Sequence, residues 1–155
     1  MIFRKALMPD VEKIHGLINH YASQGLMLPR SRSLLYETLR EFTVVEEDGR
    51  FLGAGALHIT WEDLAEIRAL ALVEEALGRG LGKELVNRLL EEAKELRIAR
   101  VFALTYRPEF FAKCGFTVVS KDLLPHKVWR ECINCPEFPN CDEIAVLHEI
   151  ELPEL

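Results

Sequence analysis

Residues 64–85 read LAEIRALALVEEALGRGLGKEL and contain an apolar strand pattern, a glycine-rich turn and the start of a helix. The pattern predicts the strand from about Ala65 to Leu72. Glycines follow at the alternate positions 78, 80 and 82. The predicted helix then places apolar residues on one face, at Leu81, Leu85, Leu89, Leu90, Ala93 and Leu96. A strand, a tight loop and an amphipathic helix in this order indicate an α/β domain.

The glycine turn suits a phosphate or pyrophosphate ligand. Glycine lets the backbone turn tightly and lets a ligand approach its N–H groups, and the helix N-terminus behind the turn favours negative charge. Arg79 and Lys83 add positive charge at this point of the chain. The spacing matches neither the P-loop nor the dinucleotide-binding fingerprint. Taken alone, the pattern leaves open a glycine turn that only caps a helix.

The rest of the chain alternates between strand and helix patterns, and we read it as one domain over residues 1–155. Further strands are predicted at 2–7, 42–46, 51–60, 101–105, 116–119 and 143–150. Asp48-Gly49 is a hairpin turn signal between two of them. Helices are expected from Asp10 to Gly25, after a cap at Ser33, and from Pro108 to Gly115. Residues 121–142 form an irregular, cysteine-rich insertion before the last strand.

The composition excludes several classes of protein. The chain has 155 residues, of which 49% are hydrophobic, so it can bury a core. The formal net charge of −6 disfavours non-specific binding to nucleic acid. No apolar run approaches the ~18 residues of a membrane-spanning helix, and the first residues lack the apolar block of a signal peptide. We therefore expect a soluble, cytoplasmic protein with no nucleic-acid or membrane partner.

Two blocks of the sequence resemble the GNAT N-acetyltransferases. Residues 66–72 followed by 77–85 are similar to the family's acetyl-CoA signature, and FFAKCGF at 110–116 is similar to the short helix and Gly-Phe turn after its fifth strand. The resemblance implies a mixed, mostly antiparallel central sheet flanked by helices. It also implies that the fourth and fifth strands splay apart, commonly at a β-bulge.

The resemblance further implies acetyl-CoA as co-substrate and assigns its contacts. Pantetheine would bond to the backbone near Leu70, Ala71 and Leu72. The pyrophosphate would sit on the N–H groups of Leu77, Gly78, Arg79, Gly80, Leu81, Gly82 and Lys83. The chain departs from the family pattern at Leu77, where Gln or Arg is usual, and at Leu72, where Val is commoner.

Three further stretches, at 24–32, 101–107 and 122–125, are similar to the acetyltransferase domain of the N-acetylglutamate synthase family. This narrower resemblance implies direct transfer of an acetyl group to the α-amino group of L-glutamate, the first step of arginine biosynthesis. Because no amino-acid kinase domain is present in the sequence, the chain resembles the short, stand-alone type.

The chemistry of acetyl transfer requires a proton acceptor, because only an unprotonated amine attacks the thioester. Glu66 stands where many family members place a carboxylate base; the alternative is a strand glutamate that pairs with Arg68 or faces solvent. A backbone N–H near Leu70 or Leu72 would stabilise the oxyanion. The usual tyrosine acid is Phe111 here. A CoA thiol can leave as a thiolate near pH ~8 without one.

Three arginines are candidates for binding the acceptor's carboxylates, because a planar guanidinium pairs well with them. Arg107 follows the predicted strand at 101–105 and ranks first. Arg30 and Arg32 lie in the predicted loop between the first two helices. For any one of them alone, a surface arginine is the simpler interpretation.

A cysteine cluster has no place in this chemistry. Cys132, Cys135 and Cys141 have C-x2-C-x5-C spacing, with His126 as the nearest fourth ligand for zinc. Free or redox-active thiols are the alternative, and we assign no metal to the active site. Two other functions stay open: a GNAT enzyme for another small amine or a protein N-terminus, and a non-catalytic acyl-CoA-binding or redox-sensing module. A homodimer is also left open.

Overall fold

The fold is described by a computed structural model that covers residues 1–124 and 143–154. Its strands are β1 (Ile2–Lys5), β2 (Phe42–Glu47), β3 (Arg50–Trp61), β4 (Leu64–Leu72), β5 (Arg100–Thr105), β6 (Thr117–Val119) and β7 (Ile144–Glu149). Its α-helices are α1 (Val11–Ala22), α2 (Arg32–Glu37), α3 (Leu81–Glu95) and α4 (Pro108–Lys113). Short 3-10 helices are η1 (Met8–Asp10), η2 (Leu39–Glu41), η3 (Glu74–Ala76) and η4 (Lys121–Leu123). The elements follow the order that the sequence predicts.

The strands pair in the order β1-β2-β3-β4-β5-β7-β6. The pairs β1–β2, β2–β3, β5–β7 and β6–β7 are antiparallel, and β4–β5 is parallel. The predicted mixed, mostly antiparallel sheet is therefore confirmed. The parallel register joins 64–66 to 100–102, although β4 runs on to Leu72 and β5 to Thr105. The expected separation of the two strands beyond this ladder stays a prediction.

The chain divides into two compact units. The first contains Met1–His58 and Ile67–Glu92, and the second contains Ile59–Glu66 and the residues from Ala93 onward. The boundary falls inside β3, β4 and α3, so three elements contribute to both units. The interpretation as a single domain stays a prediction.

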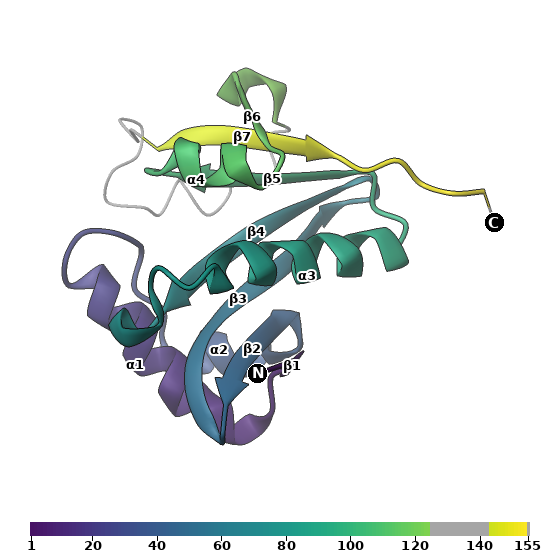
Figure 1. Ribbon diagram of the computed structural model, residues 1–155. Helices are drawn as coiled ribbons and strands as arrows, with labels where there is room; N and C mark the ends of the chain where they lie inside the picture. The colour runs from purple at the N-terminus through teal and green to yellow at the C-terminus, as the bar shows by residue number, and fades with distance from the viewer. Residues whose placement is uncertain (125–142, 155) are drawn as a thin grey trace. The chain divides into compact units, whose positions relative to one another are not determined.

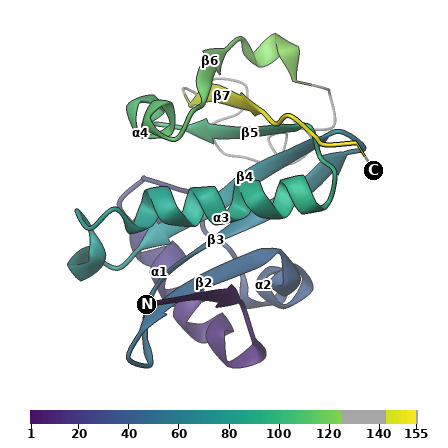
Figure 2. The same cartoon turned by 45° about the vertical axis from the view of Figure 1, so that its right-hand side comes forward.

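The first unit has a core on each face of its strands. Side chains alternate along a strand, and those of Phe42, Val44, Ala54 and Ala56 pack with buried residues of α1 and α2. Gly55 lies on the opposite face, where a Cβ would come within 3.5 Å of Leu85 and Leu89 of α3. Figures 1 and 2 show α3 running along these strands on the face away from α1. The helices thus cover both faces, as expected for an α/β arrangement.

The β2–β3 connection is the tight hairpin that Asp48-Gly49 predicts. Both residues have positive φ, 51° and 77°, and Glu47 pairs with Arg50 on either side of them. Two consecutive left-handed residues define the type I′ turn that suits the twist of a hairpin.

The caps of the first two helices differ from the prediction. Ser31, not Ser33, caps α2: its backbone is extended and its hydroxyl accepts from the Leu34 N–H at 3.1 Å. Ser33 and Arg32 therefore lie inside the helix, and Arg32 does not belong to the loop. Asp10 occupies the cap position of α1, but its carboxylate accepts from Arg4 and from the Leu7 N–H instead of from the helix. A charged guanidinium is the stronger partner for that carboxylate.

The second unit is built on β5 and β7. Their antiparallel ladder runs from Arg100↔Glu149 to Thr105↔Ile144, and β6 pairs with the other edge of β7. Its core contains Leu64, Phe102, Leu124 and Ala145, all buried. The predicted last strand at 143–150 is confirmed as β7. The cysteine cluster and His126 lie outside the described residues, so the zinc and free-thiol interpretations stay predictions.

Candidate functional site

The glycine loop connects η3 to α3 and has the backbone that its sequence requires. Gly78 and Gly80 have φ of 79° and 76°, a left-handed conformation that is strained for other residues. The Leu77 N–H donates to the Glu74 carbonyl at 3.2 Å, and the Glu84 N–H donates to the Gly80 carbonyl at 3.2 Å. Within residues 1–124 and 143–154, the N–H groups of 78–83 have no backbone acceptor.

These N–H groups lie at the N-terminus of a helix of 15 residues, an arrangement that favours a negatively charged ligand. The predicted phosphate contact of Leu77 differs from the others, because its N–H already has the Glu74 carbonyl as a partner. The backbone N–H groups that remain available to a phosphate begin with that of Gly78. Leu77 is 56% exposed and its side chain carries no polar group, so position 77 offers a phosphate no side-chain hydrogen bond.

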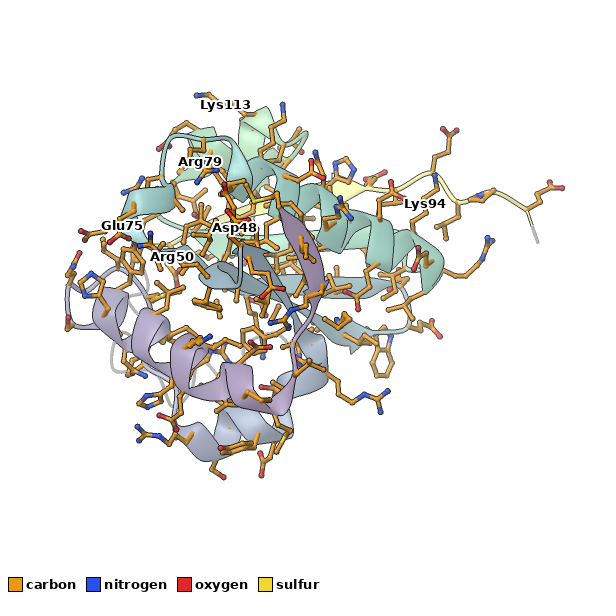
Figure 3. The ribbon with its side chains drawn as sticks, turned by 60° about the horizontal axis from the view of Figure 1, so that its bottom comes forward. Asp48, Arg50, Glu75, Arg79, Lys94 and Lys113 are labelled. Atoms are coloured by element: carbon orange, nitrogen blue, oxygen red, sulfur yellow. The ribbon has the colours of Figure 1, made fainter. Side chains whose placement is uncertain are left out.

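The two basic residues of the loop differ in their surroundings. Arg79 donates to the Glu47 carboxylate at 2.6 Å, and this hydrogen bond holds the pKa of Glu47 below its usual value. Lys83 is exposed. Arg50 and Glu75 form a second, longer ion pair of 3.7 Å between the hairpin and η3. Figure 3 shows Asp48, Arg50, Glu75 and Arg79 gathered at one end of the first unit.

The end of β4 leads directly into this loop and contains a backbone irregularity. Ala69 has φ of +52°, a left-handed conformation in an alanine inside a strand. Burial along β4 is interrupted there: Arg68, Ala69 and Leu70 are all partly exposed, whereas 64–67 before them and Ala71 and Leu72 after them are buried. Such a kink is typical of a strand whose edge is used by a ligand, and the resemblance predicts one here.

Two features that sequence reasoning missed support the end of β4. A Cβ at position 53 would lie 2.6 Å from the Ala71 carbonyl oxygen and 3.0 Å from the Leu72 Cα, so glycine is needed there. The Tyr21 hydroxyl donates to the Leu72 carbonyl at 2.6 Å. Gly53 in a strand pattern is a signal of close backbone approach. No local signal marks Tyr21, because its partner lies 51 residues along the chain.

Glu66 lies in the part of β4 that belongs to the second unit, opposite Phe102 of β5. It is only 8% exposed. The interpretation of Glu66 as a strand glutamate that faces solvent is therefore excluded. A buried carboxylate three residues before the kink at Ala69 is suitably placed in the sequence for proton transfer.

The three predicted arginines differ in their exposure and in their contacts with other residues. Arg107 of the second unit caps α4, is exposed, and has no side-chain ion pair within the described ranges. Arg30 of the first unit is partly buried, and its carbonyl accepts from Asn19 of α1 at 3.1 Å. Arg32 forms a bidentate pair with Glu12, at 2.7 and 3.1 Å. Arg107 is the most available of the three for a carboxylate ligand.

Phe111, at the position of the usual tyrosine, is a core residue. It is 6% exposed and packs edge-on against Phe110 and Phe116, with ring centroids 5.2 and 5.1 Å apart. It offers no proton. Cys114 is also buried, at 8% exposure. Its thiol is a packing group, as the sequence predicts.

Comparisons with known proteins agree with this geometry. The sequence profile described as "Acetyltransferase (GNAT) family" matches residues 10–116. An N-acetyltransferase of Chlorobaculum tepidum is 37% identical over 144 residues, which cover 93% of both chains. An amino-acid acetyltransferase of Mycobacterium tuberculosis is 39% identical over 133 residues, 84% of this chain and 76% of the relative.

Solved structures extend the comparison. A crystal structure of a Mycobacterium tuberculosis protein in complex with CoA has a TM-score of 0.84 at 33% identity, and covers 97% of this chain and 100% of that one. The N-acetylglutamate synthase of Neisseria gonorrhoeae, complexed with coenzyme A and N-acetyl-glutamate, has a TM-score of 0.88 at 30% identity. The match covers 97% of this chain and 35% of the synthase. The predicted GNAT fold is confirmed.

No helix in the described ranges is both long and apolar enough to cross a membrane.

Proposed function

Because the chain belongs to the acetyltransferase (GNAT) family, we propose that it transfers the acetyl group of acetyl-CoA to the α-amino group of L-glutamate. The observation that carries the proposal is the loop at 78–83 at the N-terminus of α3, whose N–H groups have no backbone acceptor among the described residues. A pyrophosphate needs such a set of donors. The amino-acid acetyltransferase and the synthase named above supply the class of acceptor.

Acetyl-CoA would lie with its pyrophosphate on residues 78–83 and its pantetheine along the end of β4. Gly78 and Gly80 keep side chains away from the phosphates, and in the described part of the chain a Cβ at either position would meet nothing within 4 Å. Lys83 supplies a positive charge. Arg79 can add a second one if it leaves Glu47, since a surface ion pair of this kind is weak.

The acetyl group then passes directly from the thioester to the amine. The amine nitrogen attacks the thioester carbonyl carbon, the carbonyl oxygen becomes an oxyanion, and the C–S bond breaks as the amide forms. Glu66 accepts the amine proton, directly or through a water, and a backbone N–H near Leu70 or Leu72 stabilises the oxyanion. The thiol leaves as a thiolate, because Phe111 cannot donate a proton.

Glutamate presents two carboxylates, and arginines are the side chains that pair best with them. Arg107 is the first candidate because its guanidinium has no ion-pair partner in the described ranges. Arg30 is the second, and Arg32 ranks last because Glu12 already engages it. With glutamate as acceptor the enzyme would supply the first step of arginine biosynthesis, and we expect it to act in the cytoplasm.

The test is mass spectrometry of the purified protein incubated with acetyl-CoA and each common amino acid separately. We expect N-acetylglutamate as the main product. An acetylated product from a different amino acid would refute the assignment of glutamate and leave the acetyltransferase activity. No acetylated amino acid, with acetyl-CoA still bound, would favour another amine, a protein acceptor or an acyl-CoA-binding module.

A further inference from the structure

A tyrosine in the last turn of α1 contacts the end of β4. The Tyr21 hydroxyl donates to the Leu72 carbonyl oxygen at 2.6 Å, within the usual range for an O–H···O hydrogen bond. The Tyr21 ring packs edge-on against that of His20, with centroids 5.2 Å apart, and His20 contacts Glu74 of η3 at 3.3 Å. The end of α1 is therefore attached to the segment that joins β4 to the glycine loop.

The peptide that Tyr21 holds has a defined orientation. The Val73 N–H donates to the Leu52 carbonyl of β3 at 2.8 Å. In a trans peptide the N–H and C=O point in opposite directions, so the Leu72 carbonyl points away from β3. Residues alternate along a strand, and Leu70 and Leu72 thus direct their backbone groups toward the same edge of β4.

That edge is the one on which pantetheine is expected, and three contacts fix its end. Val73 is bonded to β3, the backbone at 71–72 packs closely on Gly53, and Tyr21 takes the Leu72 carbonyl. On the other side of Leu70, Ala69 has a left-handed backbone conformation. The short segment 70–72 is therefore positioned by its neighbours and not by regular pairing alone.

We propose that Tyr21 is a positioning residue for coenzyme A. By bonding the Leu72 carbonyl, its hydroxyl fixes the end of β4 so that the backbone groups of Leu70 and Leu72 meet the pantetheine arm. The hydroxyl also occupies the Leu72 carbonyl oxygen, so the pantetheine arm bonds to the N–H of Leu72 and not to this carbonyl. The inference rests on the proposed function, because it assumes that this edge binds CoA.

The test is the dissociation constant of CoA, measured by isothermal titration calorimetry, for the wild type and for Tyr21→Phe. Loss of one neutral hydrogen bond corresponds to about a three- to tenfold weaker binding. Adenosine 3′,5′-bisphosphate, which lacks pantetheine, should bind both proteins equally. Tyr36→Phe is the matched control, since Tyr36 on α2 is 47% exposed. It should bind CoA as the wild type does.

Kinetics separates a positioning role of Tyr21 from a purely structural one. The following results are expected if Tyr21 positions CoA. Tyr21→Phe should raise the KM for acetyl-CoA without changing the KM for the amino acid. Replacement of Tyr21 by 4-aminophenylalanine, which restores a donor, should recover the affinity for CoA. Both results hold even where Tyr21→Phe lowers the melting temperature.

Three outcomes would overturn the inference: unchanged binding of CoA, tighter binding of CoA, or an equal loss for CoA and for the bisphosphate. Tighter binding would mean that the hydroxyl competes with the ligand for the Leu72 carbonyl. Failure of the wild type to bind CoA would refute the proposed function instead, so the two failures are distinguishable.

Discussion

Two carboxylates are buried among the described residues, and we expect them to have different roles. Asp10 is 4% exposed and Glu66 is 8% exposed. Asp10 accepts two hydrogen bonds from Arg4, at 2.7 and 3.0 Å, and one from the Leu7 N–H at 2.7 Å. Glu66 lies in a strand next to the segment that we expect to bind the thioester. We therefore assign stability to Asp10 and proton transfer to Glu66.

Glu66→Gln should lower kcat about 10²- to 10³-fold near pH 7, because the amide cannot accept a proton. Raising the pH should restore part of the rate, since the free amine then forms without a base. The measurement is the pH profile of acetyl transfer, with the exposed Glu62→Gln in the β3–β4 turn as control. A normal rate for Glu66→Gln at neutral pH would remove it from the mechanism.

Asp10→Asn should destabilise the fold by about 2 kcal/mol, because it breaks a pair of which one member is buried and the other partly exposed. The hydrogen bond from Arg4 holds the pKa of Asp10 below its usual value. The carboxylate therefore stabilises the fold fully above the unfolded pKa of about 3.9, and this contribution is lost as the pH falls toward the folded pKa.

Urea unfolding checks this prediction at pH 7 and at pH 3. The difference between the wild type and Asp10→Asn should be largest at pH 7 and shrink at pH 3. Glu12→Gln, which breaks the exposed pair with Arg32, should leave the midpoint unchanged. A difference for Asp10→Asn that does not depend on pH would contradict the assignment.

Arg107→Ala should raise the KM for the acceptor about tenfold or more while the affinity for acetyl-CoA stays the same, because a lost charge-assisted pair costs about 1.5–3 kcal/mol. Arg107→Lys should give an intermediate effect, since an ammonium cannot form the planar fork. Steady-state kinetics in both substrates checks this, with the exposed Arg40→Ala as control. An equal loss for both substrates would refute the role.

At the scale of elements, the sequence predicts what depends on local spacing and misses what depends on distant partners. The glycine loop, the Asp48-Gly49 hairpin and the strand β7 follow from patterns within ten residues. The helix cap was predicted two residues too late, because Ser31 and Ser33 are equivalent in sequence and only the backbone distinguishes them. The contacts of Tyr21 and of Arg79 join segments 51 and 32 residues apart, and no local pattern marks them.

The contact between the hairpin and the glycine loop gives a prediction for both elements. Glu47→Gln should tighten CoA binding by about two- to threefold, because Arg79 no longer has a carboxylate partner and a negative charge near the phosphates is removed. The gain should disappear at high salt. Calorimetry at two salt concentrations checks it, with the exposed Glu37→Gln of α2 as control. Weaker binding would show that Glu47 instead holds Arg79 in place for the ligand.

At the scale of the whole molecule, charge explains why the phosphate site depends on backbone groups. The chain carries 25 acidic and 19 basic side chains. The resulting net negative charge repels an anionic cofactor. Directed N–H groups at a helix N-terminus attract phosphates without changing that balance. The composition disfavours non-specific nucleic-acid binding, which stays a prediction. The division into two units could not be predicted, because its boundary falls inside strands and a helix.

The central claim is that this acetyltransferase acts on glutamate through both of its carboxylates. The most direct measurement is kcat/KM at saturating acetyl-CoA for L-glutamate, L-glutamine and L-aspartate. We expect glutamate to be the best of the three, because glutamine lacks the second charge and aspartate places it about one methylene too close. Equal values for the three amino acids, a preference for glutamine, or no turnover of glutamate would contradict it.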